Sequence, residues 1–192
     1  ALRAELARDT DLAGLPSMLR QMKRRVALLA ALADLGGVWS LEEVTGALTA
    51  LADRSVDLCV RHLVQAEIRR GKLPDLPDAA VMVVLAMGKM GAGELNYSSD
   101  IDLICLFDDT LHDDPQEART AFIRATRRMA AILSDNTAEG YVFRTDLRLR
   151  PDAAVTPVCL SISAAESYYE AEGRTWERAA FIKARPCAGD IA

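Results

Sequence analysis

Apolar residues in the first third of the chain recur three and four positions apart, which is the spacing of one face of a helix. Two stripes follow this spacing: Met18, Met22, Val26, Leu29 and Leu32, then Val56, Cys59, Val60, Leu63 and Val64. Between the stripes, Ser40 and Glu43 form a capping box, which predicts that a helix begins near Leu41. The pattern predicts a helical bundle over residues 1–73. Prolines then interrupt the helical pattern, because proline removes a backbone donor, and this predicts a linker over residues 74–80.

After the linker, short apolar runs rich in β-branched residues replace the helical spacing. The runs Val81–Met87, Ile101–Phe107 and Tyr141–Leu149 are predicted to be strands. Between the second and third runs, apolar residues four and three apart over positions 118–132 predict a helix with one apolar face. Strands and helices alternate in this part, so the sequence predicts an α+β domain over residues 81–192.

Two further helices are predicted near the C-terminal end of the sequence. Ser163 and Glu166 form a second capping box, which predicts a helix that Gly173 stops. A helical segment over Trp176–Arg185 is expected to end at Pro186.

Composition and charge exclude several classes of protein. With 51% hydrophobic and 27% charged residues, the 192-residue chain is expected to fold rather than stay disordered. The sequence has only two histidines, and they are far apart. They are too few for a histidine-rich zinc centre, and they offer few candidates for the histidine of a Ser-His-Asp hydrolase. The four cysteines include no Cys-x-x-Cys pair and are expected to be core residues in a reducing compartment, so we expect a cytoplasmic protein.

Neither a membrane nor a nucleic acid is an expected partner. No apolar stretch is long enough to cross a bilayer, and no N-terminal signal pattern is present. The formal net charge of −5 argues against broad binding to nucleic acid backbones, since that binding depends on Lys and Arg. Small phosphorylated ligands stay compatible with this charge because a few local cations are enough to bind them.

The most informative segment begins where the first predicted strand runs into the glycine-rich turn Gly88–Gly93. Backbone N–H groups at such a turn, and at the helix that follows it, can hold phosphate oxygens, so Gly88 and Lys89 are candidate phosphate-binding residues. Ser98 and Ser99 follow shortly before the second strand. Their hydroxyls either cap the turn or contact phosphate, and the sequence does not decide between these roles.

Asp100 and Asp102 lie two residues apart at the start of the second strand, so their carboxylates are expected on the same face. Adjacent carboxylates repel each other unless a cation lies between them, and Mg²⁺ prefers oxygen ligands. On the third predicted strand, Asp146 lies between Arg144 and Arg148 and supplies a third carboxylate. Three carboxylates suit phosphoryl transfer assisted by two Mg²⁺ ions. Taken alone, the aspartate pair would more often be solvated strand-end carboxylates, and Asp146 between two arginines would be a surface ion-pair ladder. The glycine-rich turn before the pair reverses this preference in favour of a nucleotide and metal site, and the pair in turn favours Asp146 as the third ligand.

Four basic residues are candidates for neutralising charge on a phosphate. They are Arg148, Arg150, Lys183 and Arg185. Each is equally compatible with a solvated surface position.

These motifs occur together in one known family. The shared segments are Gly88–Leu103, Arg144–Pro151, Tyr168–Tyr169, Arg174–Arg178 and Lys183–Arg185. In this order and spacing they closely resemble the glutamine synthetase adenylyltransferase family, a bifunctional group within the nucleotidyltransferase superfamily. The resemblance covers residues 81–190, and residues 18–65 are similar to the helical lead-in of the same family.

The resemblance implies a nucleotidyltransferase fold of the DNA polymerase β type, with a small mixed sheet and flanking helices. In this family the N-terminal half removes AMP from a tyrosine of glutamine synthetase by phosphorolysis and releases ADP, while the C-terminal half attaches AMP from ATP. Three segments resemble the removing half more than the attaching half: Glu94–Asp100, Tyr168–Tyr169 and Arg174–Arg178. The expected substrates are therefore phosphate and adenylylated glutamine synthetase.

The resemblance also assigns roles by motif position. Asp100, Asp102 and Asp146 would be the catalytic metal ligands, while Gly88, Lys89, Ser98, Ser99, Arg148 and Lys183 would bind phosphate or nucleotide. Because the sequence starts at Ala1 and stops soon after Gly189, we expect a fragment of a longer protein, in which a PII signalling protein and glutamine act as regulators. Two alternatives stay open: the attaching half or another protein-modifying nucleotidyltransferase, and a catalytically incomplete module that binds nucleotide or the target enzyme.

Overall fold

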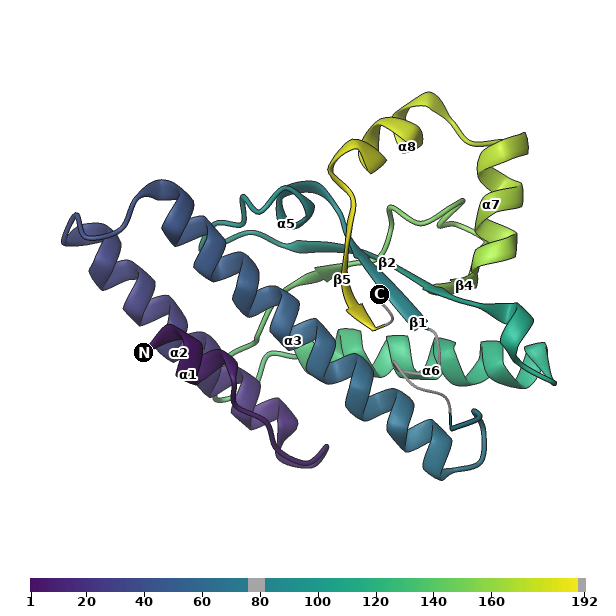
Figure 1. Cartoon of the computed structure of the whole chain (residues 1–192), viewed down its shortest axis with the longest axis horizontal. Coiled ribbons are helices and arrows are strands. Elements are labelled where there is room, and N and C mark those ends of the chain that lie inside the picture. Colours follow the sequence, from purple (N-terminus) through teal and green to yellow (C-terminus); the bar gives the residue numbers. More distant parts are fainter. Residues whose placement is uncertain (76–81, 190–192) are drawn as a thin grey trace.

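A computed structural model describes residues 1–75 and 82–189 and has an α+β architecture (Figure 1). The elements in chain order are α1 (Leu2–Leu6), α2 (Leu15–Leu35), α3 (Leu41–Arg69), β1 (Met82–Ala86), α5 (Gly88–Gly91), β2 (Ile101–Phe107), the 3₁₀ turn η1 (Asp109–Leu111), α6 (Pro115–Ser134), β3 (Thr145–Asp146), β4 (Cys159–Ser161), α7 (Ile162–Ala171), α8 (Thr175–Ala180), the 3₁₀ turn η2 (Phe181–Lys183) and β5 (Arg185–Gly189). Helices occupy the first part of the chain, and strands alternate with helices after it. The predicted α+β class is confirmed.

Helices α2 and α3 lie side by side and are joined by a short turn (Figure 1). At the start of α3, the Oγ of Ser40 accepts from the Glu43 N–H at 3.3 Å, and Glu43 Oε2 accepts from the Ser40 N–H at 2.7 Å. Two backbone donors that the helix itself cannot satisfy are thereby paired. The predicted capping box at this position is confirmed.

Within the described ranges, five strands form one mixed sheet in the order β3-β2-β1-β5, and β4 also pairs with β2. β1 is antiparallel to both β2 and β5, whereas β3 and β4 run parallel to β2. β3 pairs with the start of β2 and β4 with its end, so the two short strands share one edge of β2. The start of β2 is therefore where β3 and the turn after β1 meet.

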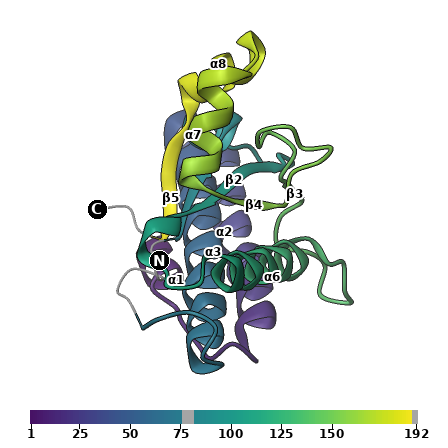
Figure 2. The ribbon, with the colours of Figure 1, turned by 90° about the vertical axis from the view of Figure 1, so that its right-hand side faces the viewer.

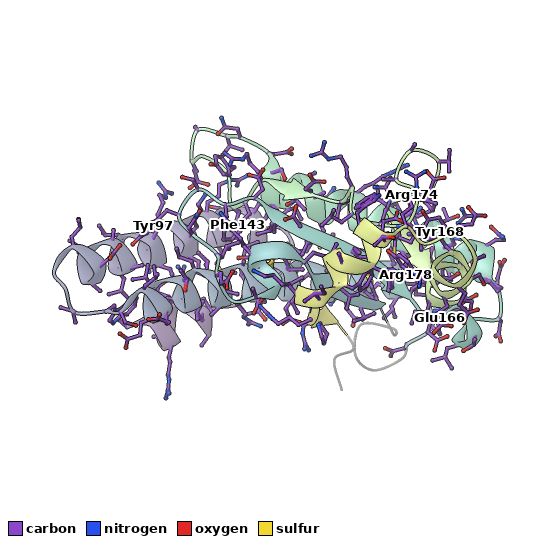
Figure 3. The ribbon with its side chains drawn as sticks, turned by 90° about the horizontal axis from the view of Figure 1, so that it is seen from above. Tyr97, Phe143, Glu166, Tyr168, Arg174 and Arg178 are labelled. Carbon is purple, nitrogen blue, oxygen red and sulfur yellow. The ribbon has the colours of Figure 1, made fainter. Side chains whose placement is uncertain are left out.

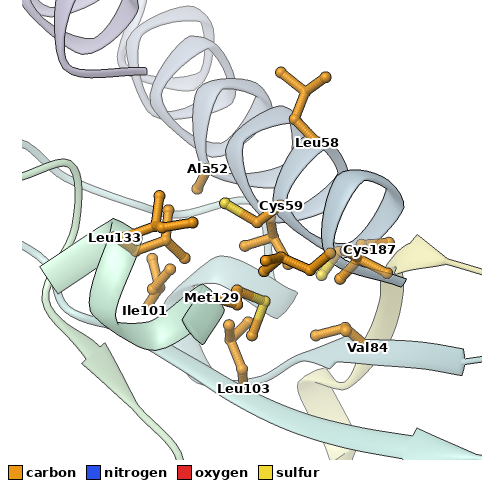
Figure 4. Close-up of a cluster of buried hydrophobic side chains, with 14 of the residues drawn as sticks. Ala52, Leu58, Cys59, Val84, Ile101, Leu103, Met129, Leu133 and Cys187 are labelled. Carbon is orange, nitrogen blue, oxygen red and sulfur yellow. The ribbon is translucent and has the colours of Figure 1, made fainter. Parts of the chain in front are cut away.

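The two faces of β2 have different environments. Ile101, Leu103 and Cys105 are at most 1% exposed and contribute to the core beneath helices α3 and α6. Figure 4 shows part of this core, in which Met129 of α6 and Cys59 of α3 lie close to the strand residues. Helices α7 and α8 lie on the other side of the sheet from α6 (Figure 2). The predicted placement of Ile101, Leu103 and Cys105 in the core is confirmed, although Ile104 between them is also buried.

The N-terminal helices and the sheet share a single hydrophobic core, which includes side chains of α2, α3, α6 and the strands. A pair of hydrogen bonds from Arg124 of α6 to Glu67 of α3 adds to this contact, with Nε to Oε1 at 2.9 Å and Nη2 to Oε2 at 2.5 Å. Of the predicted linker over residues 74–80, only Pro74 and Asp75 lie within the described residues, and they have no regular secondary structure. Val81, the predicted first residue of a strand, also lies outside them.

The third predicted strand, Tyr141–Leu149, is wrong in its extent because only Thr145–Asp146 pairs with β2. The backbone N–H groups of Val142 and Phe143 both donate to the Leu133 carbonyl at 2.9 Å, so this part of the segment is held at the end of α6. The alternation of apolar and polar residues therefore belongs to a loop whose apolar side chains reach the core.

The predicted helix over Trp176–Arg185 is also wrong in its second half. Helix α8 ends at Ala180, a 3₁₀ turn follows, and residues 185–189 form strand β5 beside β1. Pro186 is tolerated because β5 is at the edge of the sheet, where a strand has N–H groups without ladder partners. A proline after a helical segment can thus belong to the first residues of a strand and need not mark the end of the helix.

Helix α7 begins two residues earlier than predicted. Ser161 is the N-cap, and its Oγ accepts from the Ala164 N–H at 3.2 Å, so the predicted capping box of Ser163 and Glu166 is wrong. At the other end, the Gly173 N–H donates to the Tyr168 carbonyl at 2.9 Å, just beyond the last helical residue. The predicted stop at Gly173 is therefore close to the observed one.

The four cysteines, Cys59, Cys105, Cys159 and Cys187, are buried thiols without disulfide bonds. Burial raises the pKa of Cys159 to about 12, so this thiol stays protonated and unreactive at neutral pH. The prediction that the cysteines are core residues is confirmed. No helix within the described ranges has the length and apolar character needed to span a membrane.

Candidate active site

The start of β2 places Asp100 in the wall of a surface hollow, and Asp102 follows two residues further along the strand. Ile101 between them is fully buried, and its N–H donates to the Arg144 carbonyl at 2.9 Å, which fixes the strand against the segment that leads into β3. The hollow has a volume of about 400 Å³ and is lined by Asp100, Arg144, Thr145, Asp146, Leu147 and Arg148. Asp100 is exposed here, whereas Asp102 is half-buried.

Strand β3 brings the third predicted carboxylate to the pair. In the parallel register Ile101 lies opposite Thr145, and Asp102 lies opposite Asp146. Burial raises the pKa of Asp102, and the negative charges of Asp146 and then Asp100 raise it further. The predicted proximity of the three aspartates is thus reflected in the electrostatics of Asp102, which forms no ion pair within the described residues.

The glycine-rich turn approaches Asp102 from the other side. Gly88 begins α5 with φ of +53°, a left-handed conformation that favours glycine. A Cβ on Gly88 would lie 2.9 Å from Asp102 Oδ2, and the Met87 N–H donates to the Asp102 carbonyl at 2.9 Å. The turn backbone therefore lies directly against the Asp102 carboxylate, and Lys89 next to it is exposed.

The two predicted phosphate-binding serines have different environments. The Ser99 hydroxyl donates to Asn96 Oδ1 at 2.7 Å and accepts from the Asn96 N–H at 3.2 Å, so it stabilises the loop. Ser98 is exposed, and its carbonyl accepts from Arg144 Nη2 at 2.8 Å. Of the two hydroxyls, that of Ser98 is the more accessible to a ligand.

The same loop is tied to the N-terminal helices through Tyr97. Its hydroxyl donates to Asp34 Oδ2 of α2 at 3.2 Å. Figure 3 shows Tyr97 near the helical pair in the left half of the view, whereas Arg174 and Arg178 lie in the right half. The part of the structure that holds Arg174 and Arg178 is therefore distinct from the loop before β2.

Arginines form ion pairs with the two outer carboxylates of the site, those of Asp100 and Asp146. Arg144 forms a short ion pair with Asp100, which raises the pKa of Arg144. Arg148 holds Asp146 through Nε at 2.9 Å and Nη2 at 2.5 Å from Oδ2, and this hydrogen bonding lowers the pKa of Asp146. Because both arginine side chains are more than half exposed, these ion pairs are weak and can be exchanged for other partners.

The remaining predicted cations already have partners. Lys183 Nζ lies 2.9 Å from Glu94 Oε2, with both side chains at least half exposed. Arg150 donates to the carbonyls of Leu147 and Ala153 and so organises the loop after β3. Arg150 is therefore a structural residue, while Lys183 stays accessible.

Arg185, one of the four candidates for neutralising charge on a phosphate, is turned toward helix α3. Its Nη2 donates to Asp53 Oδ1 and Oδ2 at 2.8 and 2.9 Å, and to the Met90 carbonyl of α5 at 3.2 Å. Sequence reasoning missed Asp53, because nothing in the sequence around a helical aspartate indicates a partner 132 residues away.

The donor atoms around Asp102 are carboxylate oxygens. No three His, Cys, Asp or Glu side chains converge on one metal position in the described part of the chain. The oxygen donors are nevertheless those that Mg²⁺ prefers, and the repulsion at Asp102 is of the kind that a cation relieves. Asp100, Asp102 and Asp146 fit Mg²⁺ chemically, provided that the exposed Arg144 and Arg148 release the outer two.

Comparison with known proteins gives one family. The model of the glutamate-ammonia ligase adenylyltransferase family matches residues 1–192. Similar proteins include the bifunctional glutamine synthetase adenylyltransferase/adenylyl-removing enzymes of two Bradyrhizobium strains and Rhodopseudomonas palustris. The protein of Bradyrhizobium sp. strain BTAi1 is 52% identical over 195 residues, which is 98% of this chain and 20% of that protein.

The protein of Bradyrhizobium sp. strain ORS 278 is 56% identical over 184 residues, 92% of this chain and 19% of that protein. The protein of R. palustris strain HaA2 is 52% identical over 199 residues, 100% of this chain and 20% of that protein. The chain thus spans about a fifth of the length of these relatives. Its whole length matches the family, and the chain belongs to the glutamate-ammonia ligase adenylyltransferase family.

Proposed function

We propose that this chain carries the adenylyl-removing activity, in which phosphate displaces AMP from an adenylylated tyrosine of glutamine synthetase and ADP is released. The observation that carries the proposal is the register of β2 and β3, which sets Asp102 opposite Asp146 while the Gly88 backbone lies against the Asp102 carboxylate. Three carboxylates beside a phosphate-binding turn are suited to transfer of a phosphoryl group. We also propose that β1, β2, β3 and α5 correspond to the nucleotidyltransferase fold.

In the proposed reaction, an oxygen of inorganic phosphate forms a bond to the adenylyl phosphorus while the bond from that phosphorus to the tyrosine oxygen breaks. The products are ADP and tyrosine, whose oxygen takes up the proton that the incoming phosphate loses. This chemistry requires mainly positioning and charge neutralisation, to which fixed charges and backbone N–H groups are suited.

Each candidate residue has a place in this scheme. Asp100, Asp102 and Asp146 would hold Mg²⁺, for which we propose two ions, and the bound metal would neutralise negative charge on the transferring phosphate. Backbone N–H groups at Gly88 and the Lys89 ammonium would bind phosphate oxygens, and Ser98 and Ser99 would contact the same ligand. Arg148 and Lys183 are exposed and would bind the incoming phosphate after leaving their present carboxylate partners.

Removal is favoured over attachment of AMP because Glu94–Asp100, Tyr168–Tyr169 and Arg174–Arg178 resemble the removing half of the family. We place the reaction in the cytoplasm, in keeping with four cysteines that carry no disulfide bond. Regulation by a PII signalling protein and by glutamine is proposed for the longer protein of which this segment would be part.

The test is to incubate the purified chain with adenylylated glutamine synthetase, Mg²⁺ and phosphate, and to measure ADP by chromatography. We expect ADP release that Asp102→Asn lowers by at least about 100-fold, because the substitution removes a charge at the site of transfer. Asp113→Asn is the matched control, since Asp113 is exposed in the loop before α6. Modification of unadenylylated enzyme with ATP would instead identify the attaching reaction, and binding without turnover would identify a regulatory module.

A further inference from the structure

The glycine-rich turn of α5 is held from behind by the segment that joins η2 to β5. A Cβ on Gly91 would lie 1.9 Å from the Lys183 carbonyl oxygen, so the two backbones are in direct contact. Lys183 Nζ reaches Glu94 just after the turn at 2.9 Å. Arg185 donates to the Met90 carbonyl at 3.2 Å, which adds a third contact to the same turn.

Helix α3 supports this arrangement along one stripe of its surface. Thr49 is 4% exposed, and its Oγ1 accepts from the Leu95 N–H at 3.3 Å. One turn further along the helix, Asp53 accepts two hydrogen bonds from Arg185 at 2.8 and 2.9 Å. Both residues of α3 therefore face the α5 turn, one by a direct hydrogen bond and the other through Arg185.

The orientation of Arg185 depends on Asp53. The Asp53 side chain is 29% exposed and that of Arg185 is 33% exposed, so their ion pair is better shielded from water than those of Arg144 and Arg148. Nη2 of Arg185 donates to both carboxylate oxygens of Asp53 and also to the Met90 carbonyl. The Asp53 carboxylate therefore orients the guanidinium toward Met90.

We infer that Asp53 and Arg185 are positioning residues, which hold the C-terminal end of α5 so that Gly88 stays against Asp102. They touch none of the atoms that react in the proposed scheme. The consequence is that helix α3 forms part of the support of the phosphate-binding turn. This inference rests on the proposed function for its catalytic effect and on the contacts above for its structural effect.

The first measurement is hydrogen exchange on the full chain. In Asp53→Asn and in Arg185→Gln, we expect the amides of residues 91–95 to exchange about 10-fold faster or more, while the amides of α6 keep their protection. Asp57→Asn is the matched control, because it lies one turn along the same helix and breaks ion pairs with Arg54 and Arg61 that do not involve α5. Equal exchange in the wild type and both variants would overturn the inference.

The second measurement is the kinetics of ADP release at varied phosphate concentration. We expect kcat to fall by about 10- to 100-fold in each variant, because small displacements of a positioning group have effects of this size. The double variant is expected to be no worse than either single variant, since both remove the same support.

A direct contact between Arg185 and phosphate would give a different result. Arg185→Gln would then raise KM for phosphate, whereas Asp53→Asn would leave it unchanged or lower it, and this split would refute the positioning role. If the wild type releases no ADP, the proposed function fails while hydrogen exchange still decides whether Asp53 and Arg185 hold the turn.

Discussion

The contact between Gly91 and the Lys183 backbone predicts a large effect from the addition of a single methyl group. In Gly91→Ala, the new Cβ would lie 1.9 Å from the Lys183 carbonyl oxygen and 2.6 Å from that of Ala86, whereas ordinary contacts begin at 3.4 Å. Both obstructing atoms belong to the backbone, so no side-chain rotation relieves the clash. One of the two segments must move by about 1.5 Å to restore normal separation.

Overpacking of this kind costs about 1–3 kcal/mol of unfolding free energy, and we expect Gly91→Ala at the upper end because neither obstructing atom can rotate away. The displaced segment includes α5, so we also expect ADP release to fall by about 100-fold. Urea unfolding followed by circular dichroism measures the first effect, and the phosphorolysis assay measures the second.

Gly46→Ala provides the matched control on helix α3. Gly46 is exposed, and a Cβ at this position meets no atom within 4 Å, so the alanine should stabilise the helix by about 0.5–1 kcal/mol. The two substitutions are identical in chemistry and are expected to have opposite signs. An unfolding midpoint for Gly91→Ala equal to or above that of the wild type would refute the close approach of α5 and residue 183.

Three more predictions concern the core and its charges. Leu103→Ala is expected to lower the unfolding free energy by about 2–5 kcal/mol, measured in urea, because Leu103 is fully buried. Asp102→Asn should unfold at the same or a higher temperature than the wild type in calorimetry at pH 7, since it removes a charge that Asp146 and Asp100 repel; a lower temperature would contradict this. Hydrogen bonding to Arg124 lowers the pKa of Glu67, so the stability lost in Glu67→Gln should be fully present above the carboxyl's ordinary pKa of 4.5 and shrink as the pH falls below it. A difference between Glu67→Gln and the wild type that persists unchanged to pH 2 would contradict this assignment.

Elements with strong local signals were predictable from the sequence. Strand β2 has the predicted bounds Ile101–Phe107, because a short apolar run that follows a turn specifies a buried strand. Helix α3 begins where the capping box placed it, since Ser40 and Glu43 satisfy each other's backbone donors within one turn. In both cases the interactions that define the element lie within a few residues along the chain.

Elements defined by distant partners were not predictable in the same way. β3 consists of two residues, and its pairing depends on where α6 ends and on the Ile101 N–H that binds the Arg144 carbonyl. β5 was not predicted, because its pairing with β1 is formed between segments about 100 residues apart. Ser161 and Ser163 are both chemically able to cap α7, and the pairing of Ser161 with β2 decides which one does.

The same distinction applies to the candidate site. The spacing of Asp100 and Asp102 predicted two carboxylates at the start of a strand, and Asp146 was placed beside them by its similar pattern. The roles of the basic residues were not predictable, because Arg144, Arg148 and Arg185 differ only in which carboxylate lies within reach. Charge alone identifies a residue as a candidate, whereas its partner decides whether it is available to a ligand.

To bind one of these basic residues, a phosphate must displace the carboxylate that already pairs with it, and the cost of this displacement differs between the residues. Arg148 and Lys183 are at least half exposed and hold exposed or partly exposed carboxylates, so a phosphate can compete for them at little cost. The Arg185 side chain is only 33% exposed, against 84% for Arg148, and burial raises the pKa of its partner Asp53 while Arg185 lowers it. Moving Arg185 to a phosphate would leave Asp53 partly buried without its counter-charge, which is unfavourable. The exposed cations near Asp146 and Glu94 are therefore the ones that a phosphate can recruit, while Arg185 keeps the turn in place.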